Sequence, residues 1–306
     1  MKTAYIIYYD KEAQKNSGFI EMLMTEFFKY DIVLEYVSYE VTAAMSGDVF
    51  KNSFNDAVFV INRTREYRLS KRFEDIDIKV FHSSKITELG NNKYKTYCYL
   101  KDYFKRKGFE PENQKEWIAD TVFVKADELK QTIDKYNGND FVIKSVDGHG
   151  GSEVFLLESC VYEKLKGHDC ILQKRIDSDS NDIRVYILFG EIYAAVLRHG
   201  KDGFKSNFSL GGSVSEYFPD EKQRNFIENF IEAFGKDELK MAGIDFILTR
   251  DGRLVFNELE EMVGSRMLYN CSKHDIVKEY DEKENRIGSD LMRRLEKYIL
   301  FEVVDS

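Results

Sequence analysis

The chain has 306 residues, of which 43% are hydrophobic and 32% are charged, and its formal net charge at pH 7 is −9. This length supports two or three domains with well-buried cores, and the acidic balance argues against a nucleic-acid-binding protein. No apolar run is long enough to span a bilayer, and the N-terminus lacks a signal-peptide pattern, so we expect a cytoplasmic protein with no membrane partner.

Residues 1–90 alternate strands with helical stretches. We expect an amphipathic helix at 17–29 and strands at 3–9, 31–37, 56–61 and 78–81. This rhythm favours a small open parallel sheet. Ligands of such sheets bind beyond the carboxyl ends of the strands. Arg63, Arg65 and Arg68 follow one strand end and are candidates for binding a substrate carboxylate, with ordinary solvated positions as the alternative.

The remaining chain passes from an α/β pattern into an α+β pattern. The middle of the chain predicts helices at 92–107 and 125–136 and strands at 117–124, 141–146, 154–157 and 170–174. From residue 182 an antiparallel pattern dominates, with elements at 183–189, 192–198, 242–249, 253–260 and a terminal helix at 288–299. The four cysteines show no metal-binding spacing and are expected to be reduced thiols.

The segment 242–260 predicts a hairpin that carries carboxylates. With Asp251 and Gly252 as a two-residue turn, Asp245 lies opposite Glu258, and Glu260 shares their face because side chains alternate. The other face is expected to be a core surface of Ile244, Phe246, Leu248, Val255 and Leu259, on which Asn257 is a polar exception. Clustered oxygen ligands suit Mg²⁺ or Mn²⁺. An ordinary surface hairpin with solvated acids is the alternative.

A glycine-rich loop follows the apolar strand that ends near Lys144. The loop reads Asp147-Gly-His-Gly-Gly-Ser152, and its glycines allow backbone N–H groups to approach an anion closely. It lacks the Gly-Lys-Ser/Thr ending of a P-loop, and no helix follows it as in a dinucleotide-binding fingerprint. The loop therefore predicts a phosphate-binding element, with a plain hairpin loop as the alternative and His149 as a loop residue.

The order of these features resembles the ATP-grasp superfamily, and most closely the RimK-type glutamate ligases. The resemblance covers about two-thirds of the chain, from Lys93 to the end of the hairpin. Its blocks are Leu172-Gln-Lys-Arg-Ile176, Asn181-Asp-Ile-Arg-Val-Tyr186, Ala194-Ala-Val-Leu-Arg198, Phe204-Lys-Ser-Asn207, Gly211-Gly212 and Ala242-Gly-Ile-Asp245. It implies a three-lobed fold in which an open parallel sheet precedes two lobes that clasp ATP, with lobes at 1–90, 91–172 and 173–306.

The resemblance also implies roles for individual residues. ATP would be bound by two phosphate-contacting lysines, a glycine lid, an adenine-side hinge, an acid near the ribose and a segment along the triphosphate: Lys93, Lys144, Gly150, Gly151, Gln173, Lys174, Arg175, Ile176, Asp182, Lys205, Ser206 and Asn207. Magnesium or manganese, expected as two ions, would be bound by Asp245, Glu258 and Glu260.

Two departures from the RimK pattern bear on the substrate. Glu260 stands where those ligases have Asn, which adds negative charge and favours divalent binding. Their Ser-Pro-Gly turn is replaced by Glu261-Met-Val-Gly-Ser-Arg266. Arg266 falls where the acceptor would lie, so we expect Arg266, together with Arg63, to bind substrate.

The reaction implied is ATP-dependent ligation of a carboxylate to an amine through an acylphosphate, with release of ADP and phosphate. Arg184 and Arg198 are the expected catalytic residues, because guanidinium groups stabilise charge on a transferred phosphoryl group. Their convergence depends on the turn at Gly190-Glu191, which the sequence leaves open. The alternatives are a non-catalytic ATP-binding module and a phosphotransferase. The substrates would be small molecules or peptides, without nucleic acid, and a homo-oligomer is one option for assembly.

Overall fold

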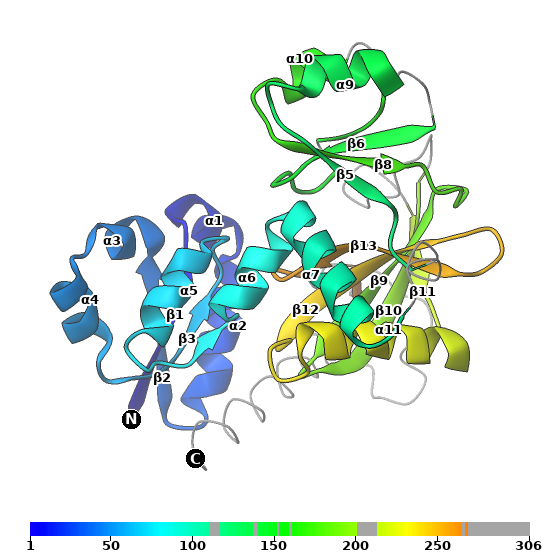
Figure 1. Ribbon diagram of the computed structural model, residues 1–306. Coiled ribbons are helices and arrows are strands. Elements are labelled where there is room, and N and C mark those ends of the chain that lie inside the picture. The colour runs from blue at the N-terminus through cyan, green and yellow to red at the C-terminus, as the bar shows by residue number, and fades with distance from the viewer. Residues whose placement is uncertain are drawn as a thin grey trace.

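The computed structural model describes residues 1–109, 117–136, 140–151, 153–158, 161–200, 213–264 and 267–268. Three sheets organise these residues into three lobes (Figure 1). The N-terminal lobe is blue to cyan, the central lobe is green, and the C-terminal lobe carries the yellow helix α11. The predicted helix at 288–299 lies outside the described residues.

The N-terminal lobe is an open parallel sheet, as predicted, with strand order β2-β1-β3-β4. Its strands are β1 (Lys2–Tyr8), β2 (Ile32–Ser38), β3 (Ala57–Asn62) and β4 (Val80–Phe81). Its helices are α1 (Asp10–Lys15), α2 (Ser17–Phe28), α3 (Tyr39–Ala44), α4 (Gly47–Phe54) and α5 (Tyr67–Glu74). Ile6 and Ile7 are both fully buried, and each joins a different hydrophobic cluster, so both faces of this sheet are covered.

The central lobe is an antiparallel sheet of order β5-β8-β6-β7. Its elements are β5 (Thr121–Val124), α9 (Leu129–Tyr136), β6 (Phe141–Ser145), β7 (Val154–Leu156), α10 (Tyr162–Leu165) and β8 (Cys170–Lys174). The strand predicted from residue 117 begins only at Thr121. The residues before it contact the C-terminal lobe instead: Ile118 bridges to Phe256, whose N–H donates to the Trp117 carbonyl (2.7 Å).

The C-terminal lobe is a five-stranded antiparallel sheet of order β11-β10-β9-β12-β13. Its strands are β9 (Asn181–Leu188), β10 (Glu191–His199), β11 (Ser213–Glu216), β12 (Met241–Leu248) and β13 (Leu254–Glu260). Helix α11 (Glu221–Phe234), which the sequence analysis missed, packs Phe230 and Phe234 into the core beneath this sheet. Asp220 and Gln223 form a capping box at its start, a signal that was readable in the sequence.

Helices α6 (Ser84–Gly90) and α7 (Lys93–Arg106) connect the first lobe to the second. Their buried residues, including Ile86, Leu100 and Phe104, belong to the same hydrophobic cluster as the C-terminal sheet. A second cluster joins Tyr8 of the N-terminal sheet to Met241 of the C-terminal sheet. The division at 1–90, 91–172 and 173–306 remains our proposal, and this packing fixes the first and third lobes against each other.

Candidate active site

The predicted hairpin consists of β12 and β13, but its turn is longer than predicted. The Thr249 N–H donates to the Arg253 carbonyl (2.9 Å), so the loop holds residues 250–252, with Gly252 at φ +81°. The prediction of a two-residue turn is therefore wrong. A bulge at Asn257 then shifts the register back, so Asp245 does lie opposite Glu258, as predicted.

The bulge also changes which side chains of β13 face the core. Leu254 and Phe256 join the hydrophobic cluster under the sheet. Val255, predicted to face that core, instead pairs with Ile247, which lines a pocket on the opposite face. Asn257 was placed on the core face as well, and it lines the same pocket. The extra residue in the bulge reverses the alternation on one side of it, which is why these two predictions are wrong.

Strand register brings two arginines and three carboxylates into one network. Asp182 of β9 lies opposite Arg198 of β10, and Arg184 of β9 lies opposite Asp245 of β12. Arg198 binds both oxygens of Asp182 (2.5 and 2.8 Å) and also Oδ2 of Asp245 (2.6 Å). Arg184 binds both oxygens of Asp245 (2.7 Å each) and reaches Glu260 at 3.4 Å. The arginines therefore converge, a question that the sequence left open.

Asp245 is the centre of this network. Its side chain is 0% exposed, and both oxygens accept from guanidinium groups. Burial alone would raise its pKa, but Arg184 and Arg198 outweigh burial and hold the pKa well below its usual range. The three predicted carboxylates therefore differ in their surroundings: Asp245 is held by two guanidinium groups, whereas Glu258 and Glu260 are not.

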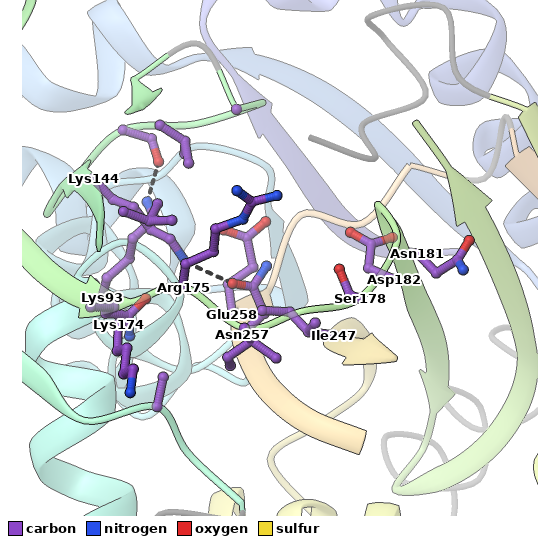
Figure 2. Close-up of a pocket in the computed structure, with 17 residues that line it drawn as sticks. Lys93, Lys144, Lys174, Arg175, Ser178, Asn181, Asp182, Ile247, Asn257 and Glu258 are labelled. Atoms are coloured by element: carbon purple, nitrogen blue, oxygen red, sulfur yellow. Dashed lines mark hydrogen bonds between the residues drawn. The ribbon is translucent and has the colours of Figure 1, made fainter. Parts of the chain in front are cut away.

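A pocket between the central and C-terminal lobes contains the two predicted lysines, and we call it the lysine pocket (Figure 2). Lys144 of β6 donates to Oδ1 of Asn257 (2.7 Å), and Lys93, the first residue of α7, donates to the Gly148 carbonyl. Both contacts are dashed in Figure 2. Burial, and secondarily the charge of Lys93, lowers the pKa of Lys144 to about 8, although Glu258 opposes this shift.

Glu258 lies on the wall of the lysine pocket, half-buried beside other acids. Burial raises its pKa, and the charges of Asp245 and Glu260 raise it further. Among the described residues, no hydrogen-bond donor reaches its carboxylate. The charges of Lys93 and Arg184 offset this only in part, and a cation bound beside Glu258 would favour its ionised form.

Other predicted ATP-binding residues line the lysine pocket, among them Gly151, Gln173, Lys174, Arg175, Ile176 and Asp182. Gly151 has a positive φ of 72°, which favours glycine. The Arg175 N–H already donates to the Asp140 carbonyl (2.7 Å), so that backbone donor of the hinge is taken. The Gln173 side chain donates to Thr121 (2.8 Å). Ser178, Asn181 and Asn257 also line the pocket, and sequence reasoning did not single them out.

A second, larger cleft lies between the N-terminal and C-terminal lobes, and we call it the arginine cleft. Its lining includes Arg63, Arg184 and Arg198, as well as Gly150 of the glycine loop. Glu258 lines both this cleft and the lysine pocket. The two spaces therefore meet at the hairpin. The predicted residues Lys205, Ser206, Asn207 and Arg266 lie outside the described residues.

Residues 114–282, more than half of the chain, match the model of the RimK-like ATP-grasp domain. The chain belongs to the RimK-like ATP-grasp family. The predicted resemblance is confirmed, and with it the expectation of an ATP-dependent ligase. Within the described residues, no helix combines the length and apolar character needed to cross a membrane.

Two curated relatives show how far the similarity extends. The uncharacterized protein MG011 of Mycoplasma genitalium is 25% identical over 291 residues, which cover 90% of each chain. A probable alpha-L-glutamate ligase of Methanococcoides burtonii is 27% identical over 176 residues, covering 54% of this chain and 57% of that protein. Similarity to the ligase is thus confined to about half of each chain.

Among solved structures, D-cycloserine synthetase DcsG superposes with a TM-score of 0.64 at 14% identity, covering 97% of this chain and 99% of that one. At 14% identity, the comparison is evidence about the fold alone. It confirms the predicted mixed architecture of a parallel sheet followed by antiparallel sheets.

Proposed function

We propose that this RimK-like protein is a Mg²⁺-dependent ligase that joins a carboxylate to an amine by way of an acylphosphate. ATP would lie in the lysine pocket and the substrates in the arginine cleft. The observation that supports the proposal is the position of Glu258. Its side chain lines both spaces, and no hydrogen-bond donor among the described residues contacts it. A phosphoryl group could pass from one space to the other at this junction.

Lys93 and Lys144 would contact the phosphates of ATP. Each already points its ammonium group into the pocket, where it bonds to an uncharged oxygen and not to a carboxylate. Gly150 and Gly151, both with positive φ, would form the lid loop over the phosphates. The strand β8 and the residues after it would flank adenine, as would be expected from the connecting position between the two lobes.

The donor set on the hairpin fits a hard divalent cation. Glu258 and Glu260 offer carboxylate oxygens, and Oδ1 of Asp245 accepts only one hydrogen bond, which leaves it a further lone pair. These three residues would hold Mg²⁺ or Mn²⁺, which the ATP-grasp family uses with ATP. When bound, such an ion supplies positive charge against the phosphate oxygens. Two ions remain the expectation.

Arg184 and Arg198 would stabilise charge on the transferred phosphoryl group. Both line the arginine cleft, and their Nε and Nη2 atoms are committed to the carboxylate network. Within the described residues, the Nη1 atom of each has no hydrogen-bond partner. The network thus holds each guanidinium in one orientation and leaves one donor group available, which is the preorganisation that electrostatic stabilisation requires.

The reaction would then proceed in two steps, activation of the carboxylate and attack by the amine. A carboxylate oxygen attacks the γ-phosphorus of ATP, the bond to the β,γ-bridging oxygen breaks, and ADP leaves. The amine attacks the acylphosphate carbon, phosphate departs with one original carboxylate oxygen, and the amine loses a proton. The substrates would be small molecules or peptides that carry these groups.

The test begins with a screen for phosphate release from ATP and Mg²⁺ in the presence of paired amino acids and small acids. The active acid is then labelled with oxygen-18 in its carboxylate. Transfer of one labelled oxygen to the released phosphate supports the acylphosphate route. Unlabelled phosphate together with normal amide formation would exclude it, and a stable phosphorylated product without an amide would indicate a phosphotransferase.

A further inference from the structure

The arginine cleft has an unusually adaptable apolar wall. Four of the eight methionines of the chain line it, namely Met22, Met241, Met262 and Met267. Tyr8, Phe19 and Tyr193 add aromatic rings. Methionine side chains are flexible and polarizable and fit irregular apolar groups. Such a wall favours a ligand with a large apolar group and disfavours one that would place a second charge there.

Arg63 is a buried cation of this cleft that lies outside the network around Asp245. It follows β3 directly, and its backbone N–H donates to the Ile7 carbonyl (2.8 Å), which fixes its position. Its side chain is 9% exposed, its Nε donates to the Tyr8 hydroxyl (3.2 Å), and its guanidinium lies 5.6 Å from the Phe19 ring centroid.

No acidic partner of Arg63 occurs among the described residues. A buried guanidinium without a carboxylate is costly to maintain unless an anion completes it. The four N–H groups on its two Nη atoms can hold a carboxylate through two parallel hydrogen bonds. The structure therefore presents an anion site with an apolar wall beside it.

Arg63 lines the arginine cleft and not the lysine pocket, where we place ATP. Glu258, in contrast, lines both spaces. A carboxylate held by Arg63 would be a recognition group and not the one that is activated. Its molecule would have to supply the other reacting group, the amine.

We propose that the amine substrate is an α-amino acid with a large apolar side chain, such as phenylalanine or methionine, whose carboxylate binds Arg63. This inference rests on the proposed ligase function and names the substrate class of its acceptor. Glutamate, the amino acid in the name of the Methanococcoides relative, would bring a second carboxylate against the methionine wall. Arg65 is exposed, and Lys15 pairs with Glu12 (2.6 Å), so neither supplies a buried partner for that carboxylate. The buried Arg184 and Arg198 are held by the carboxylate network, and we assign their remaining donor groups to the phosphoryl group.

The test measures equilibrium binding by titration calorimetry to the full chain, saturated with a non-hydrolysable ATP analogue and Mg²⁺. The ligands are L-phenylalanine, L-methionine, L-glutamate and phenethylamine, which is phenylalanine without its carboxylate. We expect phenylalanine and methionine to bind at least about tenfold more tightly than glutamate, because each buries a large apolar group. Phenethylamine should bind at least about tenfold more weakly than phenylalanine, because it lacks the carboxylate.

Two variants assign these differences to the cleft. In Arg63→Gln, phenylalanine and phenethylamine should bind with similar, weak affinity, because the carboxylate has lost its partner. The matched control is Arg68→Gln, since Arg68 is exposed on α5 and lies over the Tyr67 ring outside the cleft; it should retain the preference for phenylalanine. Met22→Lys adds a cation to the wall, so the affinity for phenylalanine divided by the affinity for glutamate should fall at least about tenfold. This variant tests the role of the wall even if Arg63→Gln does not fold.

Outcomes separate this inference from the proposed function. If the ATP analogue and Mg²⁺ fail to raise the melting temperature of the wild-type protein, the ligase proposal fails and the acceptor proposal falls with it. If the analogue stabilises the protein but glutamate binds as tightly as phenylalanine, only the acceptor proposal is overturned. The same holds if Arg63→Gln folds and still distinguishes phenylalanine from phenethylamine.

Discussion

Two groups of charged side chains meet at the β12–β13 hairpin, and their hydrogen-bonding partners are very different. In the network around Asp245, two guanidinium groups and their carboxylates are joined at 2.5–2.8 Å, apart from the longer contact to Glu260. In the lysine pocket, Lys93 and Lys144 bond to uncharged oxygens, and Glu258 has no hydrogen-bond donor among the described residues.

The shifts in pKa follow this difference. Inside the network, the paired charges outweigh burial, so the charged forms are stabilised. In the lysine pocket, burial outweighs the available partners, so the pKa of Lys144 is lowered and that of Glu258 is raised. The first group is a network whose charges compensate one another within the protein, and the second is the group that we propose to bind ATP and a divalent ion.

The largest expected effect comes from breaking the network around Asp245. Asp245→Asn leaves two buried guanidinium groups with only part of their partner, so the free energy of unfolding should fall by about 3–5 kcal/mol. Chemical denaturation measures this change. Glu228→Gln, on the exposed side of α11, serves as the control and should leave the midpoint unchanged. Equal denaturation midpoints for Asp245→Asn and Glu228→Gln would contradict a structural role for Asp245.

The opposite result is expected when the site itself is altered. Glu258→Gln should lower turnover at least about 100-fold, since a ligand for the divalent ion is lost. The midpoint of unfolding should stay unchanged or rise, because burial and the adjacent acids already disfavour the ionised form of Glu258. Phosphate release and denaturation are measured on the same preparation. A large loss of stability would show that Glu258 has a structural role.

Glu261 sharpens the comparison, because it is a buried acid that accepts a hydrogen bond from Asn91 (2.6 Å) and has no cation partner among the described residues. Burial, then the charge of Glu260, raises its pKa from 4.5 to about 7. A raised acid pKa gives stability that is complete below pH 4.5 and lost as pH rises through 7. Glu261→Gln should therefore be more stable than wild type at pH 8, by up to about 3 kcal/mol, and similar at pH 4.5. Denaturation at both pH values, without nucleotide, decides this.

The smallest effect concerns the affinity for ATP. Since the pKa of Lys144 is lowered to about 8, the free protein loses this charge as pH rises and must regain it to bind phosphate. The Kd for ATP with Mg²⁺ should therefore increase about tenfold between pH 7 and pH 9. Lys144→Arg keeps its charge over this range and should show a flatter profile. An equally steep profile in the variant would assign the effect to another group.

Much of the fold could be predicted because its signals are local. The alternation of strands and helices correctly predicted the parallel sheet. The apolar runs predicted the ends of β6, β8 and β9 to within two residues. The helices α3, α4 and α5 were missed, since each has only six to eight residues and leaves little periodicity to read. Helix α11 was missed despite its capping box.

The site was harder to predict because it depends on register and burial. Asp245 and Glu258 were correctly paired only because a turn that was one residue longer was offset by the bulge at Asn257. No property of the sequence distinguished Asp245, clamped by two arginines, from Glu258, which is not. That distinction arises from Asp182 and Arg198 on neighbouring strands, whose register depends on the turn between β9 and β10.

The two lysine contacts also tie separate lobes together before any substrate arrives. Lys144 belongs to the central sheet and bonds to Asn257 of the C-terminal hairpin, while Lys93 of α7 bonds to the carbonyl of Gly148 in the glycine loop. Both long side chains are thus already ordered, although ordering a lysine costs up to about 2 kcal/mol of rotamer entropy. An arriving polyphosphate would exchange one set of oxygen partners for another. The carbonyl of Gly148 and the side chain of Asn257 would thus hold the two ammonium groups in position until a phosphate replaces them.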